Sequence, residues 1–128
     1  MRKQFCNKDI LENATLLHKI FLESNQEIVL PIKVNFYLQK NIKTFLKNAE
    51  EIEEARLKIG EKYGEYDAND NSYVIENKEL RQKAQQELKD LLSLDQILEI
   101  YTITLEDLQD TKLTVAQMNA MLFMIDEN

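Results

Sequence analysis

Four glutamates stand close together in the middle of the sequence, at Glu50, Glu51, Glu53 and Glu54. Paired carboxylates can act as general acid and base, or can bind a metal together with histidine. On a helix, however, Glu50 and Glu54 lie on the same side, and no histidine is near them in the sequence to complete either set. We therefore interpret these residues as a solvated helix face, in which Glu54 pairs with Lys58 four residues later.

The stretch from Asp67 to Asn71 begins like a calcium-binding loop, because oxygen-bearing side chains occupy alternate positions. Ser72 stands where such a loop requires glycine, and Lys78 stands where it requires a glutamate that binds the ion through both oxygens. We expect a solvated turn rich in Asp and Asn, and no metal site.

The chain contains one histidine, His18, and one cysteine, Cys6. Nucleophilic catalysis would need these two side chains in contact, but the sequence predicts that a single helix separates them. No glycine-rich phosphate loop is present, and a single cysteine cannot form an internal disulfide. The sequence thus predicts a protein without catalytic residues, cofactor or metal, working in a reducing cytoplasm.

The net charge of −7 is distributed unevenly along the 128 residues. Residues 1–47 hold eight Lys or Arg against four Asp or Glu, residues 48–94 hold seven against twelve, and residues 95–128 hold one against seven. Direct DNA binding is not expected, because neutralising phosphates requires clustered cations. A basic protein surface is a better partner, and its attraction would weaken with salt. The alternative is that the acidic residues only keep a small protein soluble.

Two charged surfaces are candidate partner-binding sites. The acidic face consists of Glu50, Glu51, Glu54, Glu61, Glu65 and Asp67. The basic stripe consists of Lys33, Lys40, Lys43 and Lys47, with Tyr37 among them. The stripe fits an acidic partner or RNA, and the alternative is that its lysines pair in part with Asp9, Glu12 and Glu23 of the first helix.

Both surfaces depend on one long helix, which we expect at residues 31–63. Its apolar side chains recur at steps of three, four and seven, at Val34, Leu38, Ile42, Phe45, Ala49, Ile52 and Ile59. This spacing places them on one side of a helix. Pro31 suits the first helical position, and Gly64 is expected to end the helix in a left-handed conformation. At about 1.5 Å per residue the helix would be roughly 50 Å long, so other elements should pack along it.

The remaining elements are shorter and belong to a single domain over residues 1–128. We expect helices at 8–23, 77–92 and 115–125, a hairpin or loop at 65–76, and strands at 27–30 and 97–103. Asn7 and Asn77 are predicted N-caps, and Thr114 with Gln117 forms a capping-box pattern. Strands at 27–30, 72–75 and 97–103 are expected to form one small sheet.

The predicted fold class is α+β, mostly α, with shorter helices packed antiparallel along a long central helix and a small β-sheet. Two glycines and one proline in the whole chain argue against a β-sandwich or barrel. Neither a secretory signal nor a membrane-spanning stretch is expected.

Several stretches together resemble a family of small proteins of unknown function encoded by phages and prophages of Gram-positive bacteria. They are LPIKVNFYLQKN at 30–41, EKYGEYD at 61–67, YTITLEDL at 101–108 and the closing LTVAQMNAMLFMI. The resemblance runs from about Gln26 to the end of the chain. It implies a phage-encoded, non-enzymatic protein in the cytoplasm of the host bacterium. The family has no established active site, so no residue inherits a role from it.

Two functional hypotheses follow. The first is an inhibitor of a bacterial defence system, similar to anti-CRISPR proteins, which binds a basic groove of its target through the acidic face. The second is a virion component or an assembly accessory protein. A homodimer formed through apolar surface left uncovered on the long helix is a further expectation.

Overall fold

The structure, a computed structural model, describes residues 1–24 and 28–126 of the chain. Its helices are α1 (Asn7–Leu17), continued by a π-helical turn (His18–Leu22), α2 (Ile32–Tyr63), α3 (Lys78–Ser93) and α4 (Val115–Met121), with 3-10 turns at Glu106–Leu108 and Leu122–Met124. Its strands are β1 (Arg2–Cys6), β2 (Glu65–Asp67), β3 (Ser72–Val74), β4 (Asp95–Glu99), β5 (Ile103–Thr104) and β6 (Ile125–Asp126). The fold is mostly α, with small two-stranded sheets and a long central helix, so the predicted class is confirmed.

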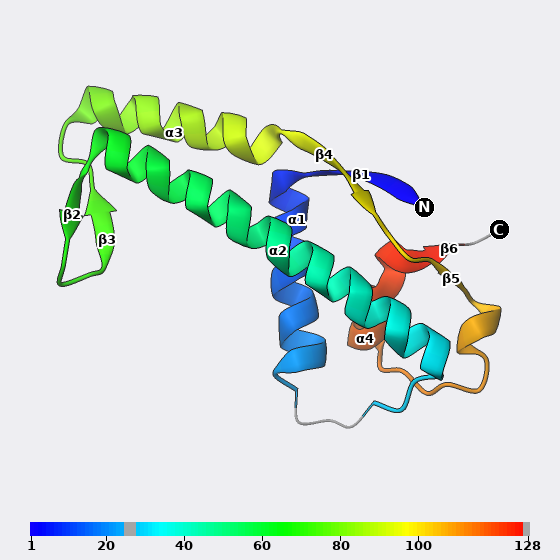
Figure 1. The fold of residues 1–128 in the computed structure, drawn as a ribbon. Coiled ribbons are helices and arrows are strands. Elements are labelled where there is room, and N and C mark those ends of the chain that lie inside the picture. Colours follow the sequence, from blue (N-terminus) through cyan, green and yellow to red (C-terminus); the bar gives the residue numbers. More distant parts are fainter. Residues whose placement is uncertain (25–27, 127–128) are drawn as a thin grey trace.

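The central helix α2 has 32 residues, and its apolar stripe lies in the core as the spacing predicts. Pro31 is its N-cap rather than its first helical residue. Figure 1 shows α2 running through the whole molecule, with α1 crossing it near its middle. The helix α3 returns antiparallel along the C-terminal half of α2, because the β2–β3 hairpin reverses the chain.

The core is centred on Phe45, whose side chain is completely buried. Its ring meets Phe5 of β1 and Phe123 edge-on, with ring centroids 5.3 Å and 5.0 Å apart. Ile10 and Leu17 bring α1 into the same cluster. The two ends of the sequence are therefore joined through α2.

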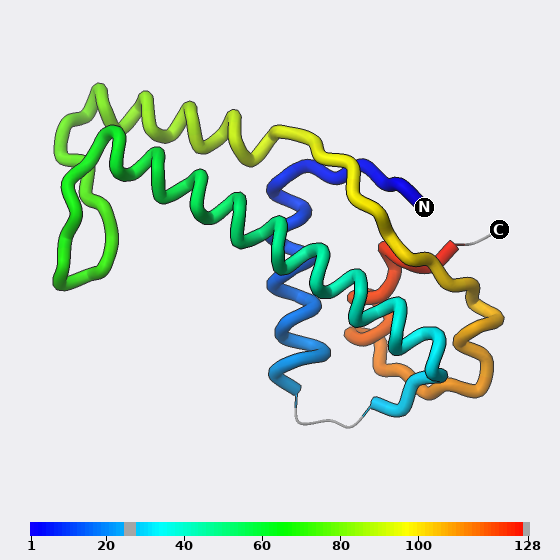
Figure 2. The backbone as a smooth tube through the Cα atoms, in the orientation of Figure 1, coloured from blue at the N-terminus to red at the C-terminus, as the bar shows by residue number. Residues whose placement is uncertain are grey.

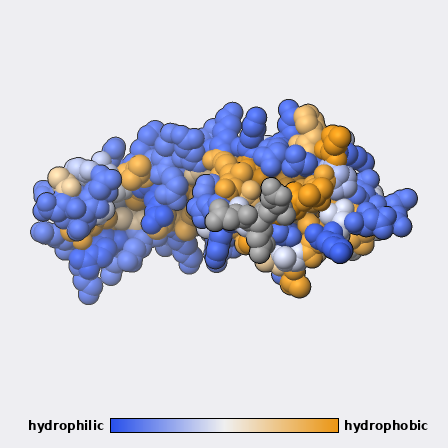
Figure 3. Space-filling view, turned by 90° about the horizontal axis from the view of Figure 1, so that it is seen from below, coloured by the Kyte–Doolittle hydropathy of each residue, from blue (hydrophilic) through white to orange (hydrophobic). Residues whose placement is uncertain are grey.

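The segment that follows Ile52 buries far fewer residues than the core does. Among residues 53–94, which we call the arm, Ala84 is the one buried residue. The tube of Figure 2 shows the arm extending away from the core as two helices closed by the β2–β3 hairpin. Figure 3 shows apolar surface gathered over the core end, whereas the arm is mostly hydrophilic.

The strands do not form the single sheet that was expected. Three separate two-stranded sheets pair β1 with β4, β2 with β3, and β5 with β6. Of the predicted strand at 27–30, residue 27 lies outside the described residues and residues 28–30 have no regular secondary structure. The predicted strand at 97–103 is divided into β4 and β5 by residues 100–102. The 65–76 segment is a hairpin, as one of its two predicted alternatives states.

Two of the three predicted helix N-caps are present. Asn77 caps α3 by accepting the backbone N–H groups of Glu79 and Leu80, and the Thr114–Gln117 capping box is present at α4. Asn7, the other predicted cap, is instead the first residue of α1. Its buried amide donates to the carbonyl of Leu91 at 2.8 Å, so it holds α1 against the end of α3.

Two further boundaries differ from expectation. Gly64 is extended, with φ −128°, so the predicted left-handed conformation is wrong. A Cβ atom at Gly64 would lie 2.8 Å from the carbonyl oxygen of Val74, and this close approach is what requires glycine. The last predicted helix, 115–125, ends early: α4 stops at Met121, and the chain continues into a 3-10 turn and β6.

Within the part of the chain that the structure describes, no helix combines the length and the apolar character needed to span a membrane.

Candidate interaction surface

The side of α2 that points away from the core carries the predicted charged residues. We call it the outer face of α2. It consists of Lys33, Phe36, Lys40, Lys43, Lys47, Glu50, Glu51, Glu54, Lys58 and Glu61, all exposed. Apart from the adjacent pair Glu50 and Glu51, these positions recur at steps of three and four, which keeps them on one side of a helix and opposite the buried stripe. The basic stripe and four members of the acidic face therefore form one continuous surface.

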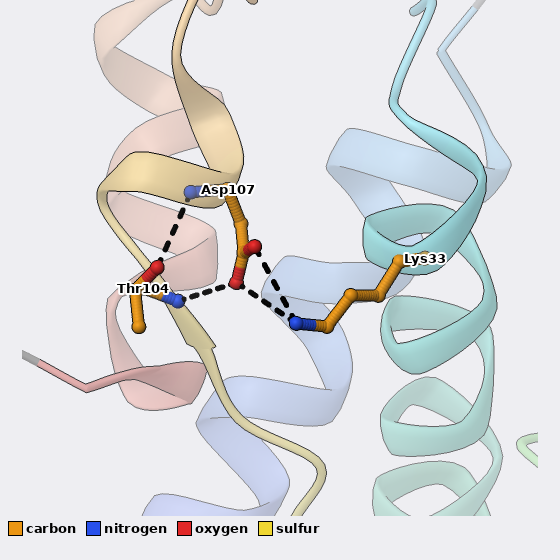
Figure 4. Close-up of polar contacts among 3 residues, drawn as sticks. All are labelled: Lys33, Thr104 and Asp107. Atoms are coloured by element: carbon orange, nitrogen blue, oxygen red, sulfur yellow. Dashed lines mark hydrogen bonds and ion pairs between the residues drawn. The ribbon is translucent and has the colours of Figure 1, made fainter.

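Lys33 is the one lysine of the stripe whose ammonium forms an ion pair with another described residue. Its Nζ lies 3.3 Å from the carboxylate of Asp107 (Figure 4). Asp107 also accepts the backbone N–H of Thr104 at 2.9 Å, while its own N–H donates to the Thr104 hydroxyl at 3.2 Å. The hydrogen bond from the Thr104 backbone, followed by Lys33, lowers the pKa of Asp107, although partial burial opposes the shift. Lys33 thus anchors the start of α2 to the 106–108 turn.

The expected pairing of the stripe with Asp9, Glu12 and Glu23 of the first helix is not found. Among residues 1–24 and 28–126, Lys40, Lys43 and Lys47 form no ion pair. Glu23 pairs with His18 instead, at 2.9 Å. Three exposed cations therefore remain for a partner.

An aromatic side chain that the sequence interpretation missed lies within the basic half. Phe36 is 55% exposed, and the ammonium of Lys40 lies 5.3 Å from its ring centroid. Tyr37, beside it, packs on Tyr101 with ring centroids 5.2 Å apart. The signal was present in the sequence, because Phe36 is three residues after Lys33 and four before Lys40, on the same helix side.

The acidic half begins immediately after Lys47. Glu50, Glu51 and Glu54 are exposed and form no ion pair with another described residue, so the predicted Glu54–Lys58 pair is absent. Glu61 accepts a hydrogen bond from the Tyr73 hydroxyl at 3.2 Å. Burial, together with this bond to Glu61, raises the pKa of Tyr73.

The two remaining members of the predicted acidic face lie beyond the helix. Glu65 is exposed on β2, whereas Asp67 is half-buried and accepts the backbone N–H of Asn69 at 2.9 Å. Asp67 thus stabilises the turn, which makes it a weaker contact residue. The acidic surface with unpaired charge is centred on Glu50, Glu51 and Glu54.

Other candidate chemistry is not assembled. The 67–71 stretch is the hairpin turn, with Asn71 at φ 52°, and the described residues contain no group of three or more possible metal ligands from His, Cys, Asp and Glu. Cys6 precedes the first residue of α1 and His18 follows its last, so the helix separates them. A groove beside α1 is lined by Leu11, Ala14, Leu46, Ala49 and His18, among others, without Cys6.

One ion pair holds the two helices of the arm together. Lys62 of α2 lies 2.7 Å from the carboxylate of Glu87 on α3. This hydrogen bond raises the pKa of Lys62 and lowers that of Glu87, although desolvation opposes both shifts. The pair cross-links the far end of α2 to α3, away from the outer face.

Comparison of the chain with models of protein families, with curated proteins and with solved structures gave no match. The argument for how the protein binds a partner therefore rests on the surface itself.

Proposed function

We propose that this protein is a non-enzymatic binding protein that places the acidic half of the outer face against a basic surface of a protein partner. The observation that carries the proposal is the group formed by Glu50, Glu51 and Glu54, three exposed carboxylates without an ion-pair partner among the described residues. The helix that carries these carboxylates is already folded, so its backbone needs no ordering when a partner binds, and only the glutamate side chains lose rotamer freedom.

The shape of the arm supports the same partner class. Glu50 and Glu61 are separated by about 16 Å along the helix axis. The carboxylates between them, interrupted by Lys58, run from the core segment of α2 onto the projecting arm. A groove that binds nucleic acid presents Lys and Arg along a comparable length, because those side chains neutralise phosphates. An acidic helix can occupy such a groove and exclude the nucleic acid from it.

More specifically, we propose that the protein is a phage-encoded inhibitor of a bacterial defence nuclease and acts in the host cytoplasm as anti-CRISPR proteins do. The resemblance of 30–41, 61–67, 101–108 and the closing segment to phage and prophage proteins supports this setting. The net charge of −7 favours binding to a target surface that is basic.

The second candidate, a virion component or assembly accessory protein, is favoured by a different observation. Val29, just before α2, is 86% exposed, Ile32 at its first position is 90% exposed, and Phe36 is 55% exposed one turn later. Apolar side chains gathered on the surface of a small protein are typical of assembly contacts.

The experiment that separates the two is affinity capture of the tagged protein from lysate of an infected Gram-positive host, followed by mass spectrometry. If the protein is an inhibitor, we expect it to capture a host nuclease or defence complex. This capture should be lost when Glu50, Glu51 and Glu54 are changed to lysine. The assembly role predicts recovery of phage structural proteins, reduced by Ile32→Ser and unaffected by the lysine substitutions.

A further inference from the structure

The order of charges along the outer face of α2 is not explained by the stability of the helix. Lysines occupy its first half and glutamates most of its second half, with Lys58 as the exception. The helix macrodipole does not set this order, because it acts within the first and last turns, and of the outer face only Lys33 and Glu61 lie there. The order does match a second copy of the same face that runs in the opposite direction, because the lysines of each copy then lie opposite the glutamates of the other.

We propose that two copies of the chain associate through the outer face of α2, with the two helices antiparallel. A twofold axis perpendicular to α2 between residues 48 and 49 brings Lys47 opposite Glu50 of the second copy, and Lys43 opposite Glu54. Because the contact is isologous, each pair occurs twice. The steps of three and four along this face are those by which helices pack side by side.

The same axis places apolar area next to the charged centre. Lys40 faces Leu57, which is 53% exposed, and Phe36 faces Glu61. The stem of a lysine can cover an apolar neighbour while its ammonium stays in water. Phe36 and Leu57 therefore lose water-exposed apolar surface on association, which the charges alone would not provide.

Only the antiparallel orientation satisfies the charges. In a parallel pair, Lys43 and Lys47 would face the same lysines of the second copy, and the glutamates would face one another. The elements α1, α3 and α4 leave the outer face uncovered, as its exposure along the helix shows. The second copy thus approaches without displacing any element of the fold.

The dimer has a functional consequence. It covers Glu50 and Glu54, the residues proposed to contact a basic target, so the dimer and the target complex exclude each other. Exposed ion pairs are individually weak and are screened by salt, so the dimer is expected at low ionic strength and at high protein concentration. Dimerisation depends on the charges of the outer face and not on the identity of a target.

The test uses two charge-reversed variants of the full chain, K43E/K47E and E50K/E54K, in sedimentation equilibrium at low ionic strength. Each reversal places like charges opposite one another, so each variant alone should dimerise more weakly by more than about tenfold. Mixed together, the two variants present complementary faces, and a one-to-one heterodimer should form. The heterodimer should dissociate in about 1 M salt, where the Debye length is roughly 3 Å.

The matched control is K78E/K83E, which makes the same charge change on exposed positions of α3. It should leave the dimer unchanged. The proposal is overturned if the wild type is monomeric at low ionic strength, if the control weakens the dimer as much as K43E/K47E does, or if the mixed variants remain apart. Circular dichroism confirms that each variant is folded, and the mixing step provides a gain of association that a misfolded chain would not give.

Discussion

Asn41, completely buried in the first half of α2, makes two hydrogen bonds to the backbone of Tyr101, sixty residues further along the chain. Its Nδ2 donates to the Tyr101 carbonyl at 2.9 Å, and its Oδ1 accepts the Tyr101 N–H at 2.9 Å. The side chain of Asn41 thus takes the place of a neighbouring strand for one residue. This contact fixes the path of the chain between β4 and β5 against the long helix.

We predict that Asn41→Ala destabilises the protein by about 2–4 kcal/mol, because both backbone groups of Tyr101 lose a partner at the edge of the core. Urea denaturation followed by circular dichroism measures the change in the free energy of unfolding. Asn35→Ala is the control, since Asn35 is exposed on the same helix and should show little change. Equal effects of the two substitutions would refute the structural role of Asn41.

The contact of Asp107 with Thr104 and Lys33 predicts a pH dependence of stability. Its pKa is lowered in the folded protein, chiefly by the Thr104 backbone N–H, so the folded state binds this proton less readily than the unfolded state. The stabilisation is therefore present at neutral pH and is lost as the pH falls through the lowered pKa. Thermal unfolding of wild type and Asp107→Asn should differ most near neutral pH and converge in acid.

Asp70→Asn, in the exposed hairpin turn, is the control for this effect. It should follow the wild type at every pH. A constant difference between wild type and Asp107→Asn from neutral pH into acid would show that the Asp107 charge contributes nothing.

The two glycines of the arm should respond differently to alanine. At Gly64 the new Cβ would lie 2.8 Å from a backbone oxygen, so Gly64→Ala should destabilise the arm by about 1–3 kcal/mol. At Gly60 it would lie 3.0 Å from the Tyr73 side chain, and the gain in helix propensity of up to about 1 kcal/mol offsets part of that contact. Denaturant titration should rank Gly64→Ala as the more damaging. The reverse ranking would contradict the close approach of Gly64 to the Val74 carbonyl.

The arm and the core should also differ in protection from hydrogen exchange. Because Ala84 is the one buried residue among 53–94, the amides of this segment should open at lower free energy than those around Phe45. Hydrogen exchange with mass spectrometry resolves the two regions by peptide. Equal protection of α3 and of the α2 segment around Phe45 would contradict this description of the arm.

Much of the α-helical structure could be predicted from the sequence, because its signals are local. The apolar stripe from Val34 to Ile52 identifies α2, and the side chains of Asn77 and Thr114 mark the starts of α3 and α4. The position of the charged residues on one side of α2 follows from the same periodicity. These features need only neighbours within a few residues.

The sheets could not be predicted in the same way. The strand β1 reads RKQFC, without the alternation of an amphipathic strand, and its partner β4 begins at Asp95, about ninety residues later. No local pattern encodes such a pairing. The β4–β5 break likewise depends on Asn41, which lies in another element and takes the place of a neighbouring strand. For the charged surface, the sequence supplied the residues, but only the structure separates Lys33, held by Asp107, from the unpaired Lys43 and Lys47.

The most direct test of the central claim is capture of partners from infected host lysate with three forms of the tagged protein, at low and at moderate salt. The forms are wild type, E50K/E51K/E54K, and the charge-matched control E76K/E79K/E106K at exposed positions outside the outer face of α2. Our account predicts that wild type and control retain the same nucleic-acid-binding host protein, and that this protein is lost with E50K/E51K/E54K and with rising salt. A partner that stays bound to E50K/E51K/E54K, or whose binding is insensitive to salt, would contradict it.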